Sequence, residues 1–187
     1  LLTRVNNEKD LQVTQEVRFA SAPSAPVSVG KAALKWHGGV FLFTQNYDQD
    51  AVNTFAPFVL SPFINFPISQ HSPQSTLDDR GLGIYGQATW TFSKNLDVVA
   101  GVRADREHKE AALSTFFAPA LPAFGPAVTL NPERDFTDVS PQFAVTYRLT
   151  PAANVYGTVA RGFKAGGFNA ASPTGAEAYN PEHTWNF

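Results

Sequence analysis

Hydrophobic and polar residues alternate with a period of two in several segments of the chain, and residues 82–93 show this most clearly. One face of this segment carries Leu82, Ile84, Gly86, Ala88, Trp90 and Phe92, and the other carries Gly83, Tyr85, Gln87, Thr89, Thr91 and Ser93. Successive side chains of a strand point to opposite faces, so the pattern predicts a strand with one apolar and one polar face. A tilted strand of about ten residues is long enough to cross a bilayer.

Further segments extend the same scheme. Strands are also predicted at residues 12–20, 36–47, 96–107, 142–149, 155–163 and 183–187, which makes about seven strands or strand beginnings in all. The facing of residues 36–47 is ambiguous, because Val40, Phe41, Leu42 and Phe43 form a continuous apolar run.

The connections between these strands alternate in length. Short turns at residues 93–95 and 150–154 join neighbouring strands into hairpins, whereas residues 48–80, 108–136 and 164–180 are long and rich in Pro, Asn, Asp, Ser and Phe. We expect the long connections to be irregular rather than stranded. Short turns at one end and long loops at the other are typical of outer-membrane barrels.

These features predict an all-β fold, an antiparallel up-and-down transmembrane β-barrel. Its seven or so strands are fewer than the eight of the smallest such barrels, so a fragment is expected. Two alternatives share the strand pattern: a secreted β-sandwich that binds a ligand through loop aromatics, and a porin-like outer-membrane protein. Aromatic residues at the end of the strands, such as Trp90, Phe92 and Tyr147, fit a membrane interface or the core of a sandwich.

Composition supports a chain that hides much of its surface from water. Charged residues make up 16% of the 187 residues, compared with roughly 25% in soluble domains. No apolar run approaches the roughly 18 residues of a membrane helix. The net charge of −2 and the scattered basic residues argue against a nucleic-acid partner, and the absence of cysteine excludes disulfides and thiolate chemistry within the chain.

No pattern predicts an enzyme, a cofactor or a metal site. Gly81, Gly83 and Gly86 match the spacing of dinucleotide-binding glycines, but a strand continues through them where that motif needs a helix. The four histidines lack metal-ligand spacing and are expected at the surface or in loops. No serine, histidine and acid lie in a nucleophile-elbow context.

Polar side chains on the strands and aromatic side chains between them are the candidate functional residues. On the polar strand faces, which would line the lumen of a barrel, lie Gln87, Arg103, Asp105, Gln142 and Arg148. An anionic cargo could be bound by Arg161, Lys164 and Asn169, and loop aromatics that could grip a ligand are Phe55, Phe58, Phe63 and Phe66. Alternatively, the lumenal residues only form space-filling salt bridges and the aromatics only pack the loops together.

Several motifs resemble the barrel of TonB-dependent outer-membrane receptors. They are Thr14-Gln15-Glu16-Val17-Arg18-Phe19, Ile84-Tyr85-Gly86-Gln87-Ala88, Val99-Ala100-Gly101-Val102-Arg103, Ser140-Pro141-Gln142-Phe143, Gly162-Phe163-Lys164-Ala165-Gly166-Gly167-Phe168-Asn169 and Tyr179-Asn180-Pro181-Glu182, in the order of the family. Each motif alone is weak, but their order and spacing are specific.

The resemblance implies an outer-membrane transporter that takes up a scarce, bulky nutrient, most often a ferric chelate and sometimes cobalamin or a glycan. Outer-membrane lipid surrounds such a barrel, and the TonB complex supplies energy through a plug segment that these motifs do not include. Barrels of this kind have 22 strands and a plugged lumen, so residues 1–187 would form about a third of the wall. We therefore expect the chain to be part of a longer protein.

Overall fold

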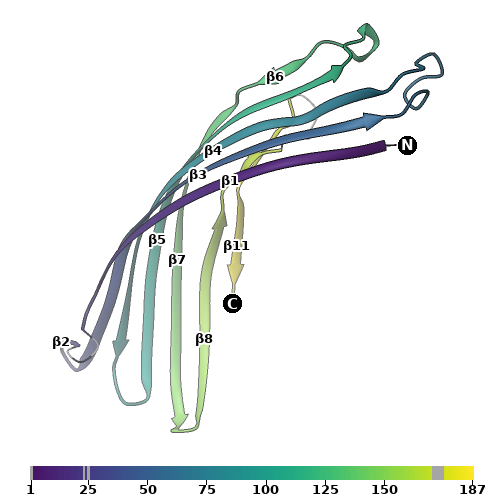
Figure 1. Ribbon diagram of the computed structural model, residues 1–187. Helices are drawn as coiled ribbons and strands as arrows, with labels where there is room; N and C mark the ends of the chain where they lie inside the picture. Colours follow the sequence, from purple (N-terminus) through teal and green to yellow (C-terminus); the bar gives the residue numbers. More distant parts are fainter. Residues whose placement is uncertain (1, 23, 25, 170–174) are drawn as a thin grey trace.

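The computed structural model describes residues 2–22, 24, 26–169 and 175–187. Most of these residues form one curved antiparallel sheet (Figure 1). In the order of pairing, its long path consists of β1 (Leu2–Ala20), β3 (Ala32–Phe55), β4 (Ile68–Thr91), β5 (Leu96–Ala118), β7 (Glu133–Thr150), β8 (Ala153–Lys164) and β11 (Glu182–Asn186). These strands confirm the all-β, up-and-down prediction. Within the described residues no second large sheet packs on this one, which excludes the sandwich.

Several shorter elements accompany the long strands. The short strand β2 (Val27–Val29) pairs with β3, and β6 (Val128–Leu130) pairs with β5. One 3-10 helix, η1, spans Pro122–Phe124. A separate two-stranded ribbon is formed by β9 (Gly167–Phe168) and β10 (Ala178–Tyr179). No helix in the described part of the chain is both long and apolar enough to cross a membrane.

The expectation that the long connections are irregular is wrong for most of the length of the first two of them, whereas in residues 164–180 most of the described residues lie outside strands. Residues 48–80 contain the end of β3 and the start of β4, and residues 108–136 contain the end of β5 and the start of β7. Backbone pairing continues there without the apolar alternation, because strands that project beyond a bilayer meet water. Pro73 lies at an irregularity between His71 and Gln74 in the β4–β5 register, where a strand tolerates a missing N–H. Of residues 164–180, the segment 170–174 lies outside the described residues.

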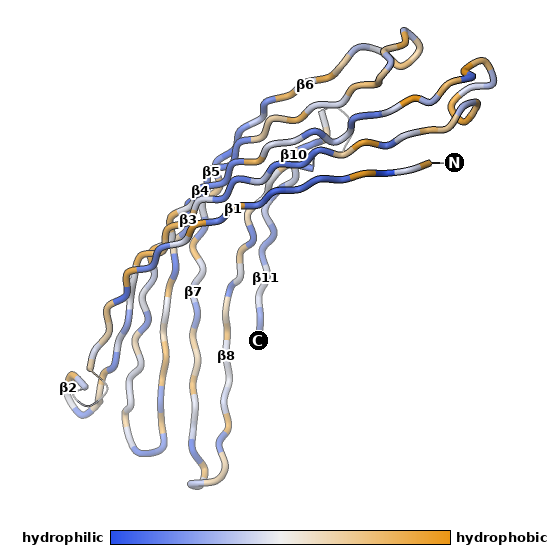
Figure 2. Tube along the Cα trace, in the orientation of Figure 1, coloured by the Kyte–Doolittle hydropathy of each residue, from blue (hydrophilic) through white to orange (hydrophobic). Residues whose placement is uncertain are grey.

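Strand register aligns the apolar positions into rows on the outer face. One row joins Val40, Ile84, Ala104 and Val139, and another joins Trp36, Ala88, Ala100, Phe143 and Val159. Ile84 is 54% exposed and Phe143 48%, so these side chains find no protein partner that covers them. Figure 2 shows the apolar positions recurring along each strand.

The register also resolves the ambiguous run in β3. Val40 and Leu42 pair with Ile84 and Leu82 on the outer face, so Phe41 and Phe43 point to the opposite face. Phe41 lies beside Arg103 there, with 5.6 Å between the guanidinium carbon and the ring centre.

The apolar rows have the height of a membrane. On β4 they run from Leu82 to Trp90 and on to Phe92, just past the end of the strand. At about 3.4 Å per residue and a tilt of about 45°, this segment rises roughly 24 Å, close to the roughly 25 Å apolar band of outer-membrane barrels. Above this level β3, β4 and β5 continue to Phe55, Ile68 and Ala118, respectively.

Candidate functional site

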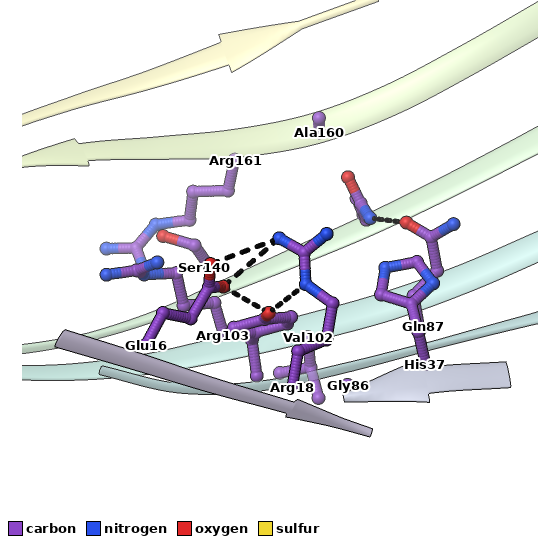
Figure 3. Close-up of a pocket in the computed structure, with 12 residues that line it drawn as sticks. Glu16, Arg18, His37, Gly86, Gln87, Val102, Arg103, Ser140, Ala160 and Arg161 are labelled. Atoms are coloured by element: carbon purple, nitrogen blue, oxygen red, sulfur yellow. Dashed lines mark hydrogen bonds and ion pairs between the residues drawn. The ribbon is translucent and has the colours of Figure 1, made fainter. Parts of the chain in front are cut away.

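Polar side chains converge on the concave face, at the height of the apolar band. They line a cavity of about 380 Å³ (Figure 3). Among its lining residues are Glu16, Arg18, His37, Tyr85, Gln87, Arg103, Ser140, Gln142 and Arg161, contributed by β1, β3, β4, β5, β7 and β8. Long side chains from two strands that flank a third strand touch one another here.

Three of the predicted lumenal residues and one of the cargo candidates meet in this cavity. The side-chain amide of Gln142 donates to Gln87 Oε1 over 2.5 Å. Arg103 lines the cavity and pairs with Asp105, at 2.7 Å from Nη2 to Oδ1, along one face of β5. Arg161 enters from β8. Gln87, Arg103, Gln142 and Arg161 therefore surround one space, with Asp105 beside it.

Glycines make these contacts across strands possible. Gly101 stands between Gln87 and Gln142 in the register, and a Cβ atom on it would lie 2.6 Å from Gln142 Nε2. Gly39 stands between Arg18 and Tyr85 in the same way. The absence of a side chain leaves room for two long polar residues to meet above the intervening strand.

Sequence reasoning did not single out the trio Glu16, Arg18 and Tyr85. The Tyr85 hydroxyl donates to Glu16, and Arg18 Nε donates to the Tyr85 oxygen over 3.0 Å. Arg18 Nη2 also lies 3.2 Å from Glu16 Oε1. The signal was present, because Glu16 and Arg18 alternate with Val17 and Phe19. The partnership with Tyr85 becomes visible only when β1, β3 and β4 are in register.

Asp138 is the most deeply buried charge of this face and was also missed. Its side chain is 4% exposed, and Arg161 Nη2 lies 2.7 Å from its Oδ1. Ser140 donates to its Oδ2 over 3.0 Å, and His183 Nδ1 lies 3.5 Å from Oδ1. A buried carboxylate needs such partners, and the Arg161 guanidinium neutralises this charge beside the cavity that Arg161 also lines.

The remaining polar candidates lie elsewhere. Arg148 is at the short-turn end, where it binds Asp97 and where Asn95 Nδ2 donates to its carbonyl oxygen over 3.0 Å. Lys164 is 71% exposed, and its Nζ lies 3.9 Å from Glu182. Asn169 lines a separate cavity of about 530 Å³ toward the loops, together with Arg4, Tyr47, Ser75 and Tyr179 among others. The structure thus divides the eight polar candidates among the first cavity, the short-turn end, the end of β8 and the second cavity.

The aromatic candidates lie at the tip of the β3–β4 hairpin. Phe55 is the last residue of β3, and Phe58, Phe63 and Phe66 follow in the loop. Phe63 is 92% exposed. None of the four contributes to either cavity described above.

The four histidines lie in strands and none of them is buried, so of the two expected places they occupy the surface and not the loops. His37 faces the cavity, and His71 stacks on Phe116 at 4.4 Å between ring centres. His108 lies near Glu110 and Glu133, with potential ligand atoms within 4.8 Å of one another. We assign no metal site, because Glu110 is already bonded to both Arg80 and His108.

A sheet with an apolar outer face of membrane height and a charged concave face defines the wall of a transmembrane β-barrel. A family model described as TonB dependent receptor-like, beta-barrel, matches residues 4–187, and the chain belongs to this family. It is a family of bacterial outer-membrane receptors and transporters, not of enzymes, and this places the chain in the outer membrane.

One solved structure has the same fold over nearly the whole chain. It is the ferric yersiniabactin uptake receptor FyuA from Yersinia pestis, with 19% identity and a TM-score of 0.66. The match covers 96% of this chain and 25% of that chain, so the chain spans about a quarter of the receptor's length. A search of curated proteins found no match.

Proposed function

We propose that this chain forms part of the wall of a receptor that imports a scarce, bulky ligand, such as a ferric chelate, with energy supplied by TonB. One observation carries the proposal: the apolar outer rows and the charged concave network lie at the same height. Charges at membrane depth are stable only against a hydrated or protein-filled interior.

The state of the concave face favours a lumen filled by protein over an open pore. Arg18 and Arg103 keep 60% and 42% of their side chains exposed in the sheet alone, although each already has a carboxylate partner. Arginine has five N–H donors. Two contacts with a carboxylate therefore leave some of these donors unused. We infer that a plug segment outside this chain accepts hydrogen bonds from them, as the family resemblance implies.

Ligand capture belongs to the loop end in this proposal. The cavity lined by Asn169, Tyr47 and Tyr179 lies above the membrane level, and Ser75 Oγ in it is buried without a hydrogen-bond partner. The exposed Phe58 and Phe63 follow the end of β3, and the exposed Lys164 is the last residue of β8; both strands end away from the short turns. Aromatic rings and a cation at a loop end suit a flat, anionic chelate.

Uptake assays test the energy coupling. Cells that carry the receptor should accumulate a radiolabelled ferric chelate, and deletion of the receptor, deletion of TonB, or collapse of the proton gradient should each abolish accumulation. A panel of chelates identifies the ligand. Uptake that persists without TonB and without the gradient would support the porin-like alternative and overturn the coupling.

A further inference from the structure

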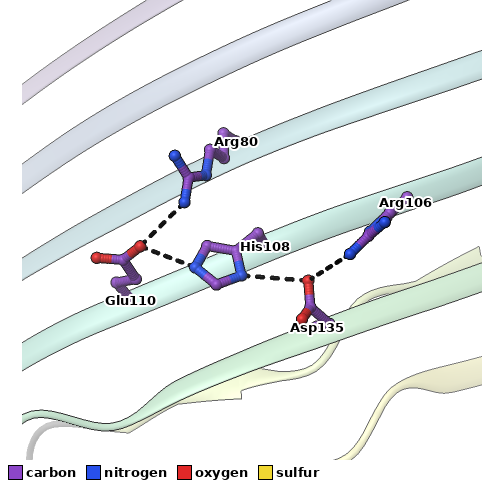
Figure 4. A network of polar contacts seen from close by, with 5 residues as sticks. All are labelled: Arg80, Arg106, His108, Glu110 and Asp135. Carbon is purple, nitrogen blue, oxygen red and sulfur yellow. Dashed lines mark hydrogen bonds and ion pairs between the residues drawn. The ribbon is translucent and has the colours of Figure 1, made fainter.

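A second polar network is drawn in Figure 4, and the register places its residues on the same outer face as Leu82 and Val139. His108 Nε2 lies 2.8 Å from Glu110 Oε1, and its Nδ1 lies 3.1 Å from Asp135 Oδ1. Arg80 lies on the far side of Glu110 at 3.2 Å, and Arg106 lies 3.7 Å from Asp135. The chain of contacts runs across β4, β5 and β7.

This network begins where the apolar band ends. Arg106 pairs with Leu82 in the register, and Leu82 pairs with Leu42, the uppermost apolar row of the outer face. Arg80 and His108 pair with each other one row farther from the membrane. The two guanidinium groups therefore lie at the level of lipid headgroups.

A groove joins the cations to the apolar band. It has a volume of about 550 Å³, and its lining includes Leu42 and Leu82 as well as Arg80, Arg106 and His108. One end of the groove is apolar and continuous with the lipid-facing rows, and the other end is cationic. This combination matches an amphiphile with an anionic head and an acyl chain.

The charge of the network changes from positive in the row nearest the membrane to negative in the row farthest from it. The row nearest the membrane holds Arg106, the next holds Arg80, His108 and Asp135, and the carboxylates of Glu110 and Glu133 lie one row beyond. Hydrogen bonds to Glu110 and Asp135 raise the pKa of His108 above its ordinary value. The guanidinium groups are exposed, with 69% of Arg80 and 70% of Arg106 accessible.

We propose that this groove binds a phosphate-bearing lipid of the outer leaflet. Arg80 and Arg106 donate to the phosphate, since planar guanidinium groups suit bidentate phosphate binding. An acyl chain of the same lipid lies along Leu42 and Leu82. Glu110 and Asp135 hold the two arginines on either side of His108. The proposal rests on the outer-membrane location and is independent of the ligand that the receptor imports.

The test uses the whole receptor that carries this wall, in nanodiscs of phosphatidylcholine doped with diphosphoryl lipid A. Native mass spectrometry counts the lipids that remain bound after release from the disc. Wild-type receptor should retain lipid A in preference to phosphatidylcholine, and the double substitution Arg80→Gln with Arg106→Gln should weaken retention about tenfold, as expected when two charge-assisted contacts are lost.

Two controls keep the result specific. Lys9→Gln removes a cation from the outer face of β1, farther from the apolar band, and should leave retention unchanged. Heat-modifiable migration in gels establishes that each variant is folded. If the double variant is not folded, Arg106→Lys replaces it, because lysine keeps the charge but loses the bidentate contact and should still reduce retention.

Four outcomes would overturn the proposal. They are equal retention by the folded double variant and the wild type, equal retention of lipid A and phosphatidylcholine by the wild type, and displacement of the lipid by inorganic phosphate at matched concentration, which would indicate a free-phosphate site. The fourth is loss of lipid on chelation of divalent cations, which would assign the contact to a cation bound by Glu110 and Glu133.

Discussion

At the scale of single residues, the concave network depends on positions without a side chain as much as on charges. Gly39 lets Arg18 and Tyr85 meet above β3, and Gly101 lets Gln87 and Gln142 meet above β5. An ideal Cβ atom on Gly39 would lie 2.6 Å from the Val17 carbonyl oxygen and 2.8 Å from the Tyr85 hydroxyl. One of these contacts is with backbone, which cannot rotate away as a side chain can.

We therefore expect Gly39→Ala to destabilise the barrel by about 1–3 kcal/mol, the usual cost of an overpacked site. The measurement is the urea midpoint of the receptor folded into lipid vesicles, followed by tryptophan fluorescence. Gly86→Ala is the matched control, because a Cβ atom on Gly86 meets nothing within 4 Å. Equal midpoints for the two variants would refute the steric argument.

At the scale of strands, sequence reasoning succeeded where one face of a strand is polar and the opposite face is apolar. Alternation identified both faces of β4 and β5 between residues 82 and 107, and it assigned Gln87, Arg103 and Gln142 to the face that carries the cavity. It failed beyond Arg80 and His108, because strands above a membrane meet water and lose the alternating signal while the backbone ladder continues. The ion pair between Asp138 and Arg161 joins two separate strands, so no pattern within either strand predicts it.

The register refines which outer position lies deepest in the membrane. On β5 the apolar rows run from Leu96 to Ala104, and Arg106 follows at the level of the last row, so Val102 lies near the midplane of the band. Val102→Arg should cost about 2–4 kcal/mol and reduce the yield of folded barrel, because it places a charge in lipid. Folded yield is measured by heat-modifiable migration.

The control for this substitution is Val99→Arg on the same strand. Val99 pairs with Thr89 and Ala144, and it points to the concave face. Arginine there can reach water or the neighbouring polar groups and should be tolerated far better. Comparable loss of folded barrel in both variants would contradict the assignment of the two faces.

At the scale of the whole molecule, the curved sheet has two long faces and two edges that its own described strands do not cover. Among these strands β1 pairs only with β3, and all 19 residues of β1 are exposed. Unpaired edge strands and broad apolar surfaces promote association.

Residues 1–187 expressed alone should therefore aggregate in plain buffer and require detergent to remain dispersed. Sedimentation velocity with and without detergent measures this. The substitution of charged residues along the apolar rows should not rescue the chain fully, because the β1 edge would persist. A monodisperse monomer in plain buffer that unfolds cooperatively would show that the sheet is stable without lipid or further strands.

The strands that continue above the apolar band give the molecule a tall rim. On β5, twelve residues separate Arg106 from Ala118, which corresponds to about 40 Å along the strand. In the receptor that we propose, ligand capture at the rim would therefore be separated in space from passage through the membrane-spanning part. Substitutions at the rim would then alter ligand preference without disturbing the segment that inserts into the membrane.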